Sequence, residues 1–126
     1  MNYNEVRFGN WVKSGDHFFK IKGVNPDWAI FLHRGDDWCT DWMLIDPIPL
    51  TPEILEKAGF EKDGDYFFFQ PMLENIHYRL IEFPEGNWIV SKGFINYNHE
   101  LRVIKYLHQL QNLYFALTGE ELEINL

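Results

Sequence analysis

Histidine and acidic side chains are the groups in this sequence that could ligate a metal ion or transfer protons. The five histidines stand far apart, and none pairs with another at the i, i+4 spacing with which a helix presents two zinc ligands: His17, His33, His77, His99 and His108. Four aspartates near Cys39 lack the Asp-x-Asp-x-Asp-Gly pattern of a calcium loop: Asp36, Asp37, Asp41 and Asp46. We predict structural histidines, a solvated acidic turn and no metal ligands; a site assembled from distant strands stays an open alternative.

Cys39 is the single cysteine of the chain, so an internal disulfide and a multi-cysteine zinc site are excluded. A catalytic thiol needs a nearby histidine or helix N-terminus to lower its pKa, and no such signature surrounds Cys39. Glycine-rich phosphate loops and a Ser-His-Asp arrangement are also absent from the sequence. We therefore predict no catalytic residue and no cofactor, and an enzyme is the least favoured of the functional hypotheses.

Aromatic residues make up 17% of the chain, with five Trp, six Tyr and eleven Phe. Aromatic side chains favour strands, and exposed ones can stack sugars or single-stranded bases. All five tryptophans lie on or beside expected strands, and we take them as a candidate binding platform: Trp11, Trp28, Trp38, Trp42 and Trp88. Core packing is the alternative, because strand alternation places such rings on an inner face.

A helix is predicted over about residues 101–117. Its apolar stripe has helical spacings of three and four residues: Val103, Leu107, Leu110, Tyr114 and Leu117. Because the stripe is wide, a sheet or a second copy of the chain must cover it, and the helix could thus form a homodimer interface. Amide and imidazole side chains gather on and beside the polar face and form our candidate interaction surface: His108, Gln109, Gln111 and Asn112. An ordinary solvated face is the alternative.

The remaining pattern predicts the elements that position these residues. Short β-type runs separated by turn residues indicate an antiparallel meander in the first third and another after residue 63. Between them, Thr51 and Pro52 suit the start of a short helix over 52–58, and Gly59 suits its end. Strands, a short helix, strands and a long helix indicate an α+β fold, and we expect one domain over residues 1–126.

Length and charge narrow the function further. The chain has 126 residues and a formal net charge of −8, spread evenly along it. Proteins that bind duplex nucleic acid depend on lysine and arginine to displace counterions, so we do not expect a nucleic-acid partner. No apolar run approaches the roughly 18 residues of a membrane span, and the first residues lack a signal-peptide layout. These features predict a cytoplasmic protein that is not in a membrane.

Three segments carry a resemblance to a known family: Arg7 to Val12, Ile48 to Phe60, and above all the run KYLHQLQNLYFALTGEEL at residues 105–122. Through them the chain resembles a family of small uncharacterised proteins of Bacteroidetes and their phages or mobile elements. The resemblance implies a bacterial or phage cytoplasmic setting. It implies no activity, cofactor or site residue.

Three functional hypotheses follow. The preferred one is a non-enzymatic protein–protein interaction module with an unidentified protein partner, working as a monomer or as a homodimer through the C-terminal helix. The alternative is an aromatic-lined domain that binds a small molecule or a sugar. A less favoured third is an acidic mimic of nucleic acid, which needs its carboxylates on one face.

Overall fold

A computed structural model describes residues 5–24, 29–34, 36–41, 44–69, 76–94, 97–124 and 126. For residues 24, 29–34, 36–41, 76, 94, 97 and 98 the description is limited to the backbone. The residues group into two compact units, of which unit 1 comprises Met1–Ile48 with Tyr106–Leu117 and unit 2 comprises Pro49–Lys105 with Thr118–Leu126. The expectation of one domain over 1–126 stays a prediction.

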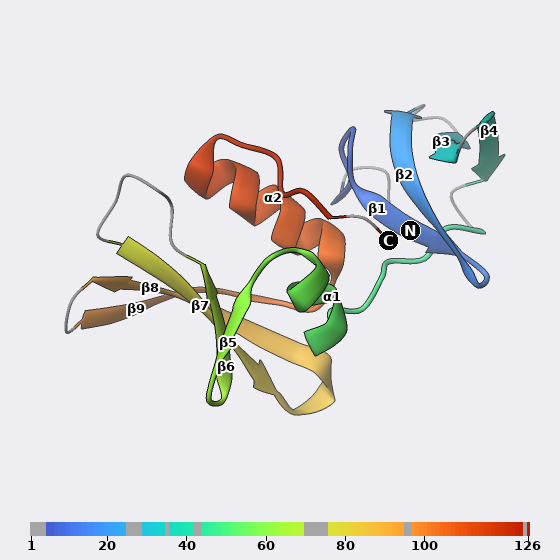
Figure 1. The fold of residues 1–126 in the computed structure, drawn as a ribbon. Coiled ribbons are helices and arrows are strands. Elements are labelled where there is room, and N and C mark those ends of the chain that lie inside the picture. Colours follow the sequence, from blue (N-terminus) through green and yellow to red (C-terminus); the bar gives the residue numbers. More distant parts are fainter. Residues whose placement is uncertain are drawn as a thin grey trace. The chain divides into compact units, whose positions relative to one another are not determined.

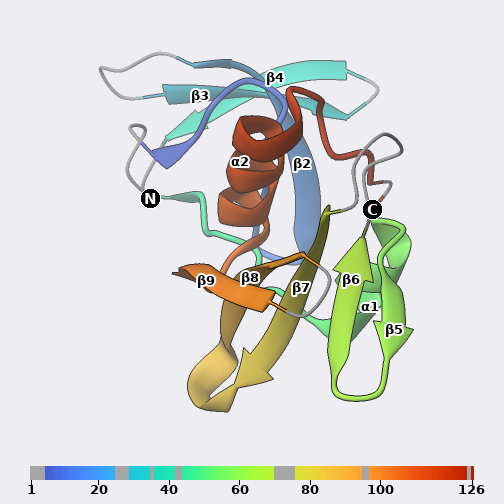
Figure 2. The same cartoon turned by 90° about the vertical axis from the view of Figure 1, so that its left-hand side faces the viewer.

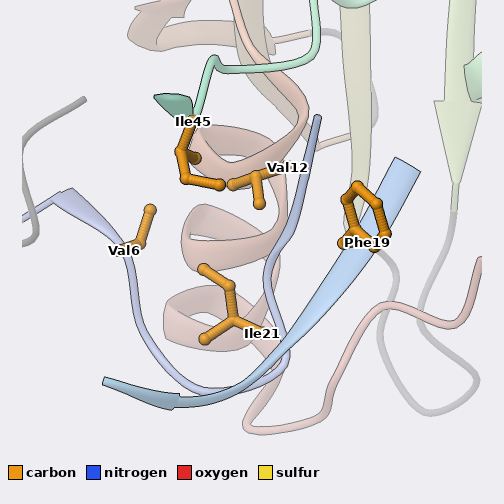
Figure 3. Close-up of a cluster of buried hydrophobic side chains, with 5 residues drawn as sticks. All are labelled: Val6, Val12, Phe19, Ile21 and Ile45. Atoms are coloured by element: carbon orange, nitrogen blue, oxygen red, sulfur yellow. The ribbon is translucent and has the colours of Figure 1, made fainter. Parts of the chain in front are cut away.

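Unit 1 contains a four-stranded antiparallel meander in the order β1-β2-β3-β4 (Figure 1). Its strands are β1 (Trp11–Ser14), β2 (His17–Val24), β3 (Ala29–Arg34) and β4 (Asp36–Asp41), and its helix is α2 (Leu107–Thr118). A core cluster forms where β1 and β2 pair, and Figure 3 shows its side chains gathered together: Val6, Val12, Phe19, Ile21 and Ile45. Val12 and Phe19 are direct cross-strand partners.

Unit 2 contains α1 (Pro52–Lys57) and a five-stranded antiparallel meander in the order β5-β6-β7-β8-β9, visible strand by strand in Figure 2. The strands are β5 (Glu61–Asp63), β6 (Tyr66–Phe69), β7 (Ile76–Phe83), β8 (Asn87–Phe94) and β9 (Tyr97–Ile104), with the 3-10 turn η3 (Pro84–Gly86) between β7 and β8. One side of this sheet is buried: Phe67, Tyr78, Leu80, Trp88, Val90 and Ile104.

The two ends of the short helix α1 are set by the residues that the sequence predicts for them. Thr51 is its N-cap, and the Thr51 Oγ1 accepts the backbone N–H of Ile54 at 3.3 Å. At the other end Gly59 has a φ of 89°, and the N–H of Phe60 donates to the carbonyl of Leu55 at 3.0 Å, which is a Schellman ending. Capping chemistry therefore sets both boundaries of α1.

The C-terminal helix begins later than predicted. Residues 101–104 belong to β9, where Val103 pairs with Ile89 and Ile104 pairs with Trp88, and α2 starts at Leu107. The helix start is set by Gln109, whose Oε1 accepts the N–H of Tyr106 at 3.1 Å, as in half of a capping box. The predicted apolar stripe is therefore helical from Leu107 onward. Its first predicted residue, Val103, lies in strand β9 instead.

The α+β class and the antiparallel meanders are confirmed. None of the helices within the described ranges has the length and apolar character that a membrane span requires.

Candidate functional site

The predicted interaction surface on α2 divides into buried and half-buried side chains. His108 and Gln111 are each only 1% exposed, whereas Gln109 and Asn112 are half-buried. Burial therefore removes His108 and Gln111 from any surface, which corrects their predicted location. A binding role for Gln109 and Asn112 stays a prediction.

The amides of α2 instead hold the chain before β1. Gln111 Oε1 accepts the N–H of Trp11 at 2.8 Å, and Gln111 Nε2 donates to the carbonyl of Gly9 at 3.1 Å. Asn112 Oδ1 accepts from Asn10 Nδ2 at 2.9 Å. We call Gln111, Asn112 and Asn10 the amide clamp. Because a buried amide must be hydrogen-bonded, this clamp explains why α2 carries amides where lysine and glutamate would be usual.

His108 lies beside the amide clamp. Its ring stacks on that of Tyr106, with centroids 6.0 Å apart, and its Nδ1 is buried without a hydrogen-bond partner among the described residues. Burial lowers the pKa of His108, and the nearby Glu5 carboxylate partly opposes this. The predicted solvent-facing imidazole is thus an internal one that favours its neutral form.

The tryptophans predicted to form a platform have different environments. Trp88 is 1% exposed, and its Nε1–H donates to the carbonyl of Leu50 at 3.3 Å, so it is a core residue of unit 2. Trp11 is half-buried on β1 of unit 1. Trp28 and Trp42, and the side chain of Trp38, lie outside the described residues. For Trp88 the core-packing alternative is correct, and it is removed from the platform.

The five-stranded sheet has a second side, which we call the outer face. Strand alternation places Tyr66, Ile81, Ile89 and Val103 there, and the register puts them directly opposite one another across β6, β7, β8 and β9. The neighbouring row on the opposite side contains Phe67, Leu80 and Val90, all buried. No member of the outer row is buried, and Val103 is 50% exposed. The outer row is therefore half-buried at Tyr66, Ile81 and Ile89 and exposed at Val103.

A hollow of about 190 Å³ lies at the β5–β7 end of the outer face. Its lining combines one guanidinium, one carboxylate, one imidazole and two aromatic rings: Asp63, Tyr66, Phe68, His77 and Arg79. Phe68 and Arg79 are direct cross-strand partners, and Tyr66 faces Asp63 across the β5–β6 hairpin. The sheet register thus brings together residues that are up to 16 positions apart in sequence.

Arg79 is the best-oriented polar group of the hollow. Its Nε donates to His77 Nε2 at 3.0 Å, and its guanidinium carbon lies 4.7 Å from the centroid of the Tyr66 ring. The Tyr66 hydroxyl donates to Asp63 Oδ2 at 3.1 Å. Within the described part of the chain, no partner is recorded for the two Nη groups of Arg79. A guanidinium held from two sides, with the four N–H donors of its two Nη groups left over, is suited to bind an anion.

The hollow is suited to binding rather than to proton transfer at His77. Since Arg79 occupies the lone pair of His77 Nε2, this nitrogen is engaged and cannot act as a base without breaking that hydrogen bond. Among the described residues, no group of three or more His, Cys, Asp or Glu side chains could hold a metal ion.

Comparison of this chain with family models, curated proteins and solved structures gives no match. The functional argument therefore depends on the geometry of the outer face.

Sequence reasoning did not select the outer face. Its signal is present as alternation, in Tyr66 and Phe68 on one run and in His77, Arg79 and Ile81 on the next. Alternation along one strand does not give the register between two strands, and it is this register that places Phe68 directly opposite Arg79.

Proposed function

We propose that the chain is a non-enzymatic protein-interaction module and that its partner binds the outer face of the five-stranded sheet. The observation that carries the proposal is the row Tyr66, Ile81, Ile89 and Val103, which crosses four strands without a buried member. A contiguous apolar row that keeps partial access to solvent is typical of interaction sites in proteins. The neighbouring Arg79 adds a residue type that is enriched at interfaces.

The size of the hollow favours a protein partner over a metabolite. Pockets for drug-sized ligands measure about 300–1,000 Å³, whereas this hollow measures about 190 Å³. It can hold one inserted side chain, while the apolar row beside it contacts the surrounding segment. Interfaces commonly combine such an anchored side chain with flat apolar contacts.

Selection from a library of random linear peptides displayed on phage tests the proposal. Val103→Lys places a charge in the apolar row, and we expect it to weaken the selected peptides by about tenfold or more, which corresponds to about 1.4 kcal/mol. Leu44→Lys is the matched control, because Leu44 is an exposed aliphatic residue of unit 1. It should leave peptide binding unchanged.

Two outcomes would contradict the proposal. One is a selection without enriched peptides, and the other is a set of peptides that bind Val103→Lys as tightly as the unmodified protein. Loss of fold would not explain weaker binding, because Val103 is half exposed on β9 and surface changes of this type alter the free energy of unfolding by about 0.5 kcal/mol or less. Urea unfolding of each variant verifies this.

A further inference from the structure

Arg79 offers a defined edge to a ligand. Its Nε–H is used by His77 Nε2, and its guanidinium carbon lies 4.7 Å from the centroid of the Tyr66 ring. The Nη1 and Nη2 groups have no partner among the described residues and therefore remain available to a ligand. Two parallel N–H groups on one edge match the two oxygens of a carboxylate.

We infer that the hollow lined by Asp63, Tyr66, Phe68, His77 and Arg79 binds the carboxylate of a glutamate or aspartate side chain supplied by the partner protein. The inference rests on the proposed function, which provides the partner, and it adds the chemistry of the anchoring residue. Arg79 forms the bidentate contact, and Tyr66 and Phe68 contact the methylene groups of the inserted side chain.

The charges in the hollow favour a carboxylate over a phosphate. Among the described residues of the lining, Arg79 is the one arginine or lysine, and Asp63 is an anion in the same hollow. His77 Nε2 accepts the Arg79 Nε–H, so this nitrogen is not the group that contacts the ligand. Arg79 can neutralise the single negative charge of a carboxylate. A phosphate carries almost two negative charges, so Asp63 and a chain of net charge −8 would repel it more strongly.

His77 is a positioning residue in this scheme. It does not contact the carboxylate, but its Nε2 fixes the plane of the guanidinium through the bond at 3.0 Å. An arginine whose plane is fixed in advance loses less conformational freedom when it binds. Removing the imidazole should therefore weaken the carboxylate contact while Arg79 itself remains.

A nuclear magnetic resonance titration with N-acetylglutamate N-methylamide tests the inference. We expect this compound to shift the Arg79 Nε–H and Tyr66 ring signals with a dissociation constant on the order of millimolar. N-acetylglutamine N-methylamide is the matched uncharged probe, and it should cause no such shift. Inorganic phosphate should bind more weakly than the carboxylate.

Variants locate the contact. Arg79→Lys loses the bidentate edge and should weaken binding about tenfold, whereas the exposed Arg102→Lys on β9 should change nothing. His77→Ala should also weaken binding, and His77→Gln should restore part of it because its side-chain carbonyl can accept from Arg79 Nε. Thermal unfolding shows whether each variant keeps its fold, and the conservative Arg79→Lys keeps the test decisive if His77→Ala unfolds.

The inference is overturned if the glutamine and glutamate probes act alike, if phosphate binds more tightly, or if Arg79→Lys and Arg102→Lys are equivalent. Failure of the proposed function has a different signature. Selected peptides that depend on Val103 but contain no acidic residue would support the module and overturn the carboxylate anchor. Carboxylate binding at Arg79 without any Val103-dependent peptide would instead overturn the protein-interaction proposal.

Discussion

The side-chain carbonyl of Gln111 accepts the backbone N–H of Trp11 at 2.8 Å, although the two residues stand 100 positions apart in the chain. The same amide donates to the carbonyl of Gly9 at 3.1 Å. One side chain thereby satisfies a donor and an acceptor of the segment that leads into β1. This explains the burial of a glutamine in α2.

Gln111→Ala should lower the free energy of unfolding by about 1–2 kcal/mol, because it leaves the part-buried N–H of Trp11 and carbonyl of Gly9 without their partner. Urea unfolding followed by circular dichroism measures the change. Glu56→Ala on the exposed side of α1 is the control and should change the free energy by about 0.5 kcal/mol or less. Equal effects of the two substitutions would refute the amide clamp.

Stability should fall as the pH drops below about 6.5, the ordinary pKa of histidine. Burial lowers the pKa of His108 in the folded state, so the unfolded chain takes up the proton first. The free energy of unfolding is then full above 6.5 and decreases from there toward the lower folded pKa. His108→Gln should flatten this dependence of the free energy of unfolding on pH. A curve for His108→Gln that parallels the unmodified protein would contradict the assignment.

Gly59→Ala should destabilise the protein by about 1 kcal/mol, because Gly59 has a φ of 89° that alanine adopts only with strain. A Cβ added there would have no heavy atom within 4 Å, so the effect comes from the backbone alone. Gly59→Asn should be milder, since asparagine tolerates positive φ. Thermal unfolding distinguishes the two, and an alanine variant as stable as the asparagine variant would disagree with this account.

Trp88→Phe should lower the free energy of unfolding by about 2 kcal/mol, since it loses buried volume and leaves the carbonyl of Leu50 without its 3.3 Å hydrogen bond. Trp11→Phe at a half-buried position should be milder. Urea unfolding of both variants checks the order. The reverse order would place Trp88 outside the core.

The sequence predicts the fold best where the determinants are local. Thr51, Pro52 and Gly59 specify the two ends of α1 through bonds that reach no further than five residues. The α+β class follows in the same way from runs of β-type residues bounded by turns. Each of these features depends on neighbours in the chain, and a single sequence contains them in full.

The start of the long helix was mispredicted for a physical reason. Val103 stands four residues before Leu107, which fits a helical stripe, but its residue type also suits a strand, and pairing with Ile89 decides the outcome. A register shift at Val90 and Ser91 breaks the simple alternation of β9. The sequence spacing around Val103 therefore fits a helix better than it fits the alternation of a regular strand.

The candidate sites depend on distant contacts that the sequence does not contain. Gln111 was interpreted as a surface residue because its partners, Gly9 and Trp11, stand about a hundred positions away. Arg79 was not selected because its surroundings arise from the pairing of β6 with β7. Side-chain types indicate what a residue can do, and strand register decides which residues do it together.

The sequence order of unit 1 has a consequence for biosynthesis. Its strands lie within residues 1–48, but α2, which supplies the clamp to Gly9 and Trp11, comes from residues 106–117. A ribosome therefore releases the four-stranded meander long before the helix that completes it, and translates the whole five-stranded sheet in the interval. The backbone groups of Gly9 and Trp11 must therefore wait for α2 before Gln111 can satisfy them.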